Sequence, residues 1–202
     1  MVRVNGLKVM NFVGTNKKIL GVILAGGKSS RMGQDKALLS FQGMSFIDRN
    51  IALLQSINCT EICISGDIHI PNINSIPDVK THNGPVVGIY SMLLYAFQKY
   101  DYLIILPIDM PLLQPELLEK LMINCIESDL SYYDKYYFPL CIKLSERTKN
   151  ILSEIIHDTP SIKNMISKLN SYKLLVPKQQ KRLFFNVNNP KEFKKLTDED
   201  KI

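Results

Sequence analysis

Two stretches of the chain are continuously apolar and long enough to form a β-strand that is buried on both faces. Residues 19–25 read Ile-Leu-Gly-Val-Ile-Leu-Ala, and residues 101–109 carry Leu-Ile-Ile-Leu-Pro-Ile between two aspartates. Neither stretch alternates polar and apolar positions, as a strand with one solvent-exposed face would. Both therefore predict central strands of a parallel sheet.

Elsewhere the apolar residues recur at helical spacing, or form short extended runs. After Gly43, Ser45 and Asp48 resemble a capping-box start, and a helical stripe follows from Phe46 to Ile57. Further helices are predicted at 86–99, 114–126, 145–157, 161–169 and from Pro190. Short strands are predicted at 61–65, at 172–176 and at 183–187, and another short extended piece ends at 76–78.

This alternation of strands and helices predicts the α/β class, as a Rossmann-like three-layer sandwich with a mostly parallel central sheet. Residues 130–137 and 138–144 suit a small antiparallel edge to that sheet. We expect one domain over residues 1–202, in which residues 1–16 are an extension without a strong pattern and the charged tail from Thr197 is frayed.

The composition is that of an ordinary globular protein, with 46% apolar and 22% charged residues among 202. It excludes disorder and fibres. The net charge of +6 favours anionic partners such as nucleotides and phosphates. Of the 25 basic residues 20 are scattered lysines, whereas arginine dominates base readout, so nucleic acid is not an expected partner.

Several features point to the cytoplasm. No run approaches the ~18 apolar residues that a membrane-spanning helix needs. Lys17 and Lys18 before the first apolar run resemble a signal peptide, but no small-residue cleavage site follows. The cysteines lack C-x-x-C spacing and a disulfide-like framework, so we expect them to be buried thiols in a reducing compartment; they are Cys59, Cys63, Cys125 and Cys141.

The segment after the first strand has the chemistry of a polyphosphate-binding loop. Glycines let the backbone approach a ligand and turn N–H groups toward it, and cations neutralise its charge. The spacing is neither that of a Walker A loop nor G-x-G-x-x-G. A flexible, lysine-rich surface loop is the plainer alternative. The segment holds three glycines and three cations: Gly26, Gly27, Gly33, Lys28, Arg31 and Lys36.

Asp109 ends the second buried strand. A carboxylate at this place must be hydrogen-bonded, paired or metal-bound, because an isolated buried charge costs several kcal/mol. Mg²⁺ takes only one or two protein carboxylates and keeps substrate oxygens as other ligands, so Asp109 suffices as a candidate metal ligand. The alternative is that Asp109 merely caps the following turn.

Four motifs follow one another along the chain. They are Leu-Ala-Gly-Gly-x-Ser-x-Arg-Met-Gly-x-Asp-Lys at 24–36, Asn-Gly-Pro-Val-Val-Gly-Ile at 83–89, Leu-Pro-Ile-Asp-Met-Pro at 106–111 and Phe-Asn-Val-Asn-Asn-Pro at 185–190. In this order they resemble the molybdenum cofactor guanylyltransferase family of the nucleotidyltransferase superfamily. The resemblance extends from about residue 19 to residue 196, and only the first motif is shared across the superfamily.

The resemblance implies transfer of GMP from GTP to molybdopterin carrying molybdenum, with Mg²⁺ as cofactor and release of pyrophosphate. The product would pass to molybdoenzymes or their chaperones. Lys36, Arg31 and Asp109 would be catalytic, and Asp109 would also bind the metal. Asn186 and Asn188 would lie on the pterin side. The expected nucleotide-binding residues are Leu24, Ala25, Gly26, Gly27, Lys36, Asp78 and Asp109.

The sequence departs from the family at two places. Where members often carry a nucleotide-binding Asn, this chain reads Ile64-Ser-Gly-Asp67, and residues 128–180 match loosely. Only one of three histidines lies near a motif, which fits a transfer reaction whose phosphate nucleophile is already ionised near pH 7. CMP transfer, another nucleotidyltransferase or a non-catalytic nucleotide-binding module are the alternatives.

Overall fold

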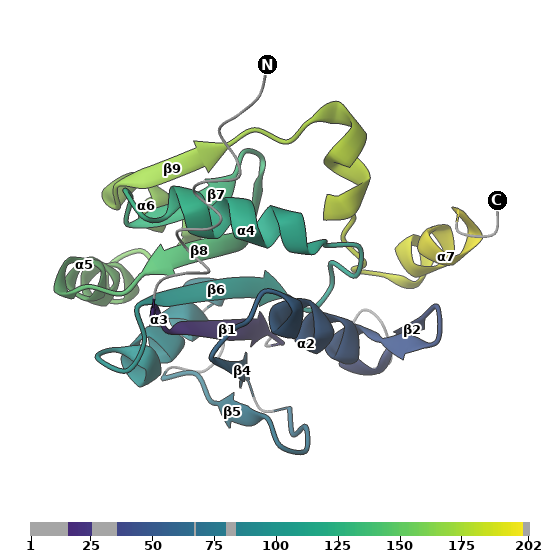
Figure 1. The fold of residues 1–202 in the computed structure, drawn as a ribbon, viewed down its shortest axis with the longest axis horizontal. Helices are drawn as coiled ribbons and strands as arrows, with labels where there is room; N and C mark the ends of the chain where they lie inside the picture. The colour runs from purple at the N-terminus through teal and green to yellow at the C-terminus, as the bar shows by residue number, and fades with distance from the viewer. Residues whose placement is uncertain (1–15, 26–35, 67, 80–83, 200–202) are drawn as a thin grey trace.

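The computed structural model describes residues 16–25, 36–66, 68–79 and 84–199, and seven strands of this part form one sheet (Figure 1). Their order is β5-β4-β1-β6-β8-β7-β9, and all neighbours pair in parallel except those of β8, which is antiparallel to both β6 and β7. The strands are β1 (Ile19–Leu24), β4 (Glu61–Ser65), β5 (Asn74–Ile76), β6 (Tyr102–Pro107), β7 (Leu130–Tyr133), β8 (Tyr136–Lys143) and β9 (Ser171–Leu174).

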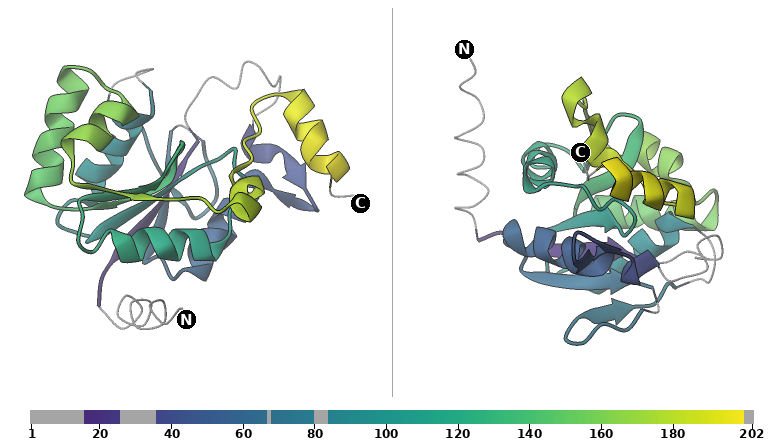
Figure 2. Two further views of the ribbon diagram at one scale, coloured as in Figure 1. Left: turned by 90° about the horizontal axis from the view of Figure 1, so that it is seen from above. Right: turned by 90° about the vertical axis from the view of Figure 1, so that its right-hand side faces the viewer.

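Helices cover both faces of this sheet and make three layers (Figure 2). One core cluster joins the sheet to α2 and α4, and a second joins its other face to α3, α5 and α6. The α/β sandwich predicted from the sequence is thereby confirmed. The helices are α2 (Phe46–Ser56), α3 (Pro85–Ala96), α4 (Pro115–Asn124), α5 (Glu146–His157), α6 (Ile162–Lys168) and α7 (Pro190–Glu199).

The continuous apolar run of β1 follows from its central place in the sheet. Ile19 and Ile23 pack in the cluster below α2 and α4, whereas Leu20 and Val22 pack in the cluster on the opposite face. All four side chains are at most 5% exposed. A strand that fills two cores cannot alternate polar and apolar residues, which explains the pattern.

A small hairpin and the C-terminal helix lie together beside the carboxyl ends of the parallel strands, at the side where α7 and β2 are seen in Figure 1. The hairpin comprises β2 (Ser40–Phe41) and β3 (Met44–Ser45), and both turn residues, Gln42 and Gly43, have positive φ. Phe41 of the hairpin shares a third cluster with Phe46, Val187 and Leu196.

Three details differ from the sequence prediction. The antiparallel strand β8 lies inside the sheet rather than at its edge, because β7 and β9 continue the sheet beyond it. Residues 183–187 form no strand: the 3₁₀ helix η3 (Lys178–Phe184) turns Phe184 onto the rings of Tyr133 and Tyr136. Helix α7 includes residues 197–199, where a frayed tail was expected.

No helix in the described part of the chain is both long enough and apolar enough to cross a membrane.

Candidate active site

The carboxyl ends of β4, β1 and β6 meet at one edge of the sheet. The Ala25 N–H donates to the Ser65 carbonyl at 3.2 Å, and the Ile108 N–H donates to the Leu24 carbonyl at 3.1 Å. These bonds continue the parallel ladders one residue beyond the strands. They fix Leu24 and Ala25 between the segments that follow β4 and β6, at the edge where ligands of α/β sheets bind.

Lys36, Asp109 and Asn188 converge at this edge from three distant parts of the chain. The Lys36 ammonium donates to Asp109 Oδ2 at 3.1 Å and to Asn188 Oδ1 at 2.9 Å. The Lys36 and Asp109 side chains are 17% and 16% exposed, so solvent screens this ion pair only in part. Lys36 begins the 3₁₀ helix η2 (Lys36–Leu38), whose Ala37 is buried in the core.

The backbone of the C-terminal segment ties this cluster together. The Val187 N–H donates to the Asp109 carbonyl at 2.8 Å, and Val187 itself is fully buried. The segment between η3 and α7 therefore lies against the end of β6. This contact places the predicted pterin-side residues, Asn186 and Asn188, on either side of Val187 next to Asp109.

Two predicted site residues carry buried acceptors that no protein group in the described structure satisfies. They are Oδ1 of Asp109 and Oδ1 of Asn186. Buried polar atoms are nearly always hydrogen-bonded, and each exception calls for an explanation such as an ion or ligand. An unsatisfied carboxylate oxygen suits a cation, and an unsatisfied amide oxygen suits a hydrogen-bond donor.

Asp78 lies on the other side of β1, beyond the end of β5. Its Oδ1 accepts a hydrogen bond from the Ser65 hydroxyl at 3.3 Å. A Cβ built on Gly88 in α3 would lie 2.6 Å from Ser65 Oγ and 3.1 Å from Asp78 Oδ1. The absence of a side chain at Gly88 is thus what allows α3 to approach these two groups.

Among the described residues, no group of three or more histidine, cysteine, aspartate or glutamate side chains could hold a metal ion. This excludes a cage built wholly from such ligands in that part of the chain. A site of one carboxylate completed by substrate oxygens needs no such group. The unsatisfied Oδ1 of Asp109 fits that simpler kind of site.

The structure thus brings Lys36, Asp109 and Asn188 into contact, while Asp78 lies apart from them across the end of β1. The predicted residues Gly26, Gly27 and Arg31 lie outside the described residues. Sequence reasoning did not assign roles to Gly88, although it lies within the second motif, or to Ser65. A single glycine within a helix and a single serine at the end of a strand leave no distinct pattern in the sequence.

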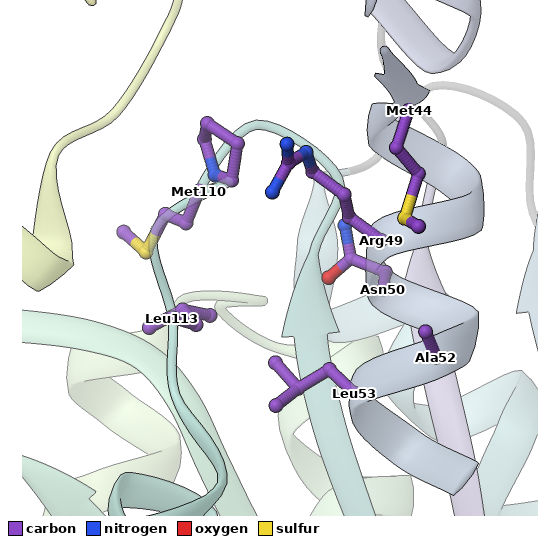
Figure 3. Close-up of a pocket in the computed structure, with 8 residues that line it drawn as sticks. Met44, Arg49, Asn50, Ala52, Leu53, Met110 and Leu113 are labelled. Carbon is purple, nitrogen blue, oxygen red and sulfur yellow. The ribbon is translucent and has the colours of Figure 1, made fainter. Parts of the chain in front are cut away.

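A separate pocket of about 180 Å³ lies between α2 and the segment that follows Asp109 (Figure 3). Its lining includes Arg49, Asn50 and Leu53 from α2 and Met110 and Leu113 from the facing segment. None of the converging residues of the sheet edge lines it. The Arg49 guanidinium is held there by the Phe41 carbonyl and lies 4.9 Å from the centre of the Phe41 ring.

A mostly parallel sheet with a lysine–carboxylate pair beyond the carboxyl ends of its strands is typical of an α/β protein that binds a ligand at this edge. Residues 21–171 match the MobA-like NTP transferase domain family. The chain belongs to this family.

Two relatives support this membership, and one solved structure shares the fold. A molybdenum cofactor guanylyltransferase of Xanthomonas euvesicatoria is 31% identical, over 89% of this chain and 95% of that protein. A probable molybdenum cofactor guanylyltransferase of Carboxydothermus hydrogenoformans is 32% identical, over 86% and 92%. The structure of molybdopterin-guanine dinucleotide biosynthesis protein A from Archaeoglobus fulgidus has a TM-score of 0.70 at 20% identity, over 90% of this chain and 98% of that one.

Proposed function

We propose that this protein transfers GMP from GTP to molybdopterin carrying molybdenum and releases pyrophosphate. The observation that carries the proposal is the convergence of Lys36, Asp109 and Asn188 at the carboxyl edge of the sheet. The two curated relatives, which align over most of their length, support the choice of this reaction within the family.

The chemistry needs anions to be held in line rather than a strong base. The acceptor phosphate monoester is ionised near pH 7, because its second pKa is about 6. One of its oxygens forms a bond to the α-phosphorus of GTP, and the bond from that phosphorus to the oxygen of the β-phosphate breaks. The leaving pyrophosphate takes the electron pair of that bond, so charge builds up on it and must be neutralised.

Lys36 is the residue that we assign to this charge, together with Arg31 of the glycine-rich loop. In the described structure the Lys36 ammonium is shared between Asp109 and Asn188. Both partners hold the ammonium by hydrogen bonds and restrict its position before a substrate arrives. Preorganised cations of this kind stabilise developing charge without reorganisation during the reaction.

We propose Mg²⁺ as the cofactor and Asp109 as the residue that holds it. The residue fits because Oδ1 of Asp109 is buried and has no hydrogen-bond partner among the described residues, while Oδ2 is taken by Lys36. When bound, a divalent cation withdraws electron density from phosphate oxygens and neutralises their charge. The carboxylate of Asp109 serves both this ion and the orientation of Lys36.

The nucleotide and the pterin are assigned to opposite sides of the Lys36–Asp109 pair. Asp78 with Leu24, Ala25, Gly26 and Gly27 would hold GTP over the end of β1. Asn186 and Asn188 would face the pterin, and the unsatisfied Oδ1 of Asn186 suits the N–H groups that a pterin ring presents.

We further propose that the protein works in the cytoplasm and passes its product to molybdoenzymes or their chaperones. The compartment is supported by the four cysteines, which are all free thiols and of which Cys63, Cys125 and Cys141 are buried. The reaction is tested by measuring pyrophosphate release from GTP with and without the pterin acceptor and Mg²⁺. We expect release only when all three are present, and equal release without the acceptor would contradict the proposal.

A further inference from the structure

Helix α7 begins with a capping arrangement that reaches back into the site. Asn189 is the residue before the helix, and its Oδ1 accepts the Glu192 N–H at 3.0 Å. The Glu192 carboxylate in turn accepts the N–H of Asn188 at 2.6 Å. This second bond lies one residue further back than in the usual capping box, where the acid bonds the N–H of the cap residue itself.

The residue held in this way is the one that contacts Lys36. The Asn188 backbone N–H is fixed by Glu192, and the Asn188 side-chain oxygen accepts from the Lys36 ammonium at 2.9 Å. The path from the carboxylate of Glu192 to the ammonium of Lys36 therefore runs through one residue. Each of its two links is a hydrogen bond in which one partner is charged, and such bonds are shorter and stronger than neutral ones.

We propose that Glu192 is a positioning residue for nucleotidyl transfer, because it fixes Asn188 and through it the Lys36 ammonium. The inference rests on the proposed function. Asn188 lies in an irregular segment between η3 and α7, where no ladder of backbone bonds holds it. Without an acceptor for its N–H the residue gains freedom, and displacement of a catalytic group by about 1 Å costs up to ~100-fold in rate.

A purely structural role for Glu192 would be stabilisation of α7. The described contacts give the helix other support: Leu196 is 2% exposed in the cluster with Phe46, and the Phe193 and Phe46 rings lie 6.1 Å apart. The cap bond from the Glu192 N–H to Asn189 uses the backbone and survives a change of side chain. Loss of the carboxylate should therefore leave α7 folded and docked.

The test compares Glu192→Gln with Glu192→Met in the full-length protein. Both replacements have similar length and favour helix, but only Gln keeps an acceptor oxygen. We expect E192M to lower kcat five- to twentyfold at saturating GTP and acceptor while KM for GTP changes less than twofold. E192Q should stay within threefold of the wild-type kcat.

The matched control is Asp48→Leu. Asp48 holds the same third position in α2, where its carboxylate accepts from the Ser45 hydroxyl at 2.5 Å and the Ser45 oxygen caps the Asp48 N–H. D48L therefore removes a capping carboxylate without touching the Lys36 cluster, and its kcat should stay within twofold of wild type. A loss equal to that of E192M would show a general effect of capping and overturn the proposal.

A double-mutant cycle with Asn188→Ala separates positioning from other effects. If Glu192 acts through Asn188, E192M should reduce the kcat of N188A by less than twofold. Independent, multiplicative losses would overturn the proposal, as would a wild-type kcat in E192M, or unfolding of E192M under conditions where E192Q is folded. Absence of acceptor-dependent transfer in the wild-type protein would instead refute the proposed function.

Discussion

Lys36 and Asp109 lie 73 residues apart in the chain, yet their charged groups meet at 3.1 Å at the carboxyl edge of the sheet. Their side chains come from different segments of the chain: Lys36 follows the glycine-rich loop after β1, and Asp109 follows β6. The pair places a cation beside a carboxylate whose Oδ1 has no hydrogen-bond partner in the described part of the chain. When a substrate binds, its phosphates can replace part of the interaction between the Lys36 ammonium and the Asp109 carboxylate.

Replacement of Lys36 by alanine should nearly abolish transfer in a folded protein. Loss of one preorganised group that stabilises developing charge typically costs about 2.7–4 kcal/mol, or ~10²–10³ in kcat. Steady-state pyrophosphate release would measure the loss of transfer, and circular dichroism would show whether the protein is folded. The matched control is Lys17→Ala, which breaks another lysine–aspartate pair, between Lys17 and Asp101 at 2.8 Å. Similar losses in both variants would refute the assignment of Lys36.

Asp109→Asn should lose divalent-cation binding more than it loses stability. The amide keeps the shape of the side chain and one oxygen for Lys36, but it lacks the negative charge that a hard cation prefers. Mn²⁺ binding followed by electron paramagnetic resonance, in the presence of GTP, gives a readout independent of turnover. Unchanged Mn²⁺ affinity in a folded D109N protein would show that Asp109 is not the metal ligand.

Gly88→Ala should raise KM for GTP, because the new methyl group would lie 2.6 Å from Ser65 Oγ and 3.1 Å from Asp78 Oδ1 and must displace one of them. Alanine is otherwise favoured over glycine within a helix by about 1 kcal/mol. The double variant Ser65→Ala/Gly88→Ala removes the closest atom and should recover thermal stability relative to G88A. If G88A has wild-type KM and stability, the close packing around Asp78 does not shape the nucleotide site.

Glu61 should make stability depend on pH far from the site. Burial disfavours its ionisation, but hydrogen bonds from Tyr100, Asn74, Tyr95 and Cys63 outweigh burial and lower its pKa to about 2 from 4.5. A depressed pKa stabilises the fold above pH 4.5, and this contribution is lost as the pH falls toward 2. The free energies of unfolding in urea of wild type and E61Q should therefore differ at pH 7, and the difference should shrink as the pH falls from 4.5 to 2. A difference that stays constant over this range would contradict the low pKa.

Most of the fold could be predicted from the sequence because its two central strands, β1 and β6, are buried on both faces. β1 and β4 occupy the predicted segments to within a residue, and the Ser45 cap of α2 is present as predicted. The β2–β3 hairpin was missed because strands of two residues leave no periodic pattern. Residues 183–187 were misread as a strand, since Phe184 and Val187 are apolar for separate reasons and pack in different clusters.

The site was predictable in its residue types more than in its contacts. The motifs named Lys36, Asp109 and Asn188, but only the fold shows that Asp109 and Asn188 both accept hydrogen bonds from the Lys36 ammonium. Glu192 could have been found from the Asn189-Pro190 start of α7, since an acid at the third helical position is a capping signal. The extent of the domain, the metal and the contacts of Gly26, Gly27 and Arg31 stay predictions.

The central claim is that this site transfers GMP to the pterin, and one measurement tests it most directly. Purified protein is incubated with Mg²⁺, molybdopterin and either GTP or CTP, and the dinucleotide product and pyrophosphate are quantified in each case. We expect equal amounts of guanine dinucleotide and pyrophosphate with GTP, at a kcat/KM at least tenfold above that with CTP, and neither product in the Lys36→Ala protein. A preference for CTP, or turnover that Lys36→Ala leaves unchanged, would contradict the account.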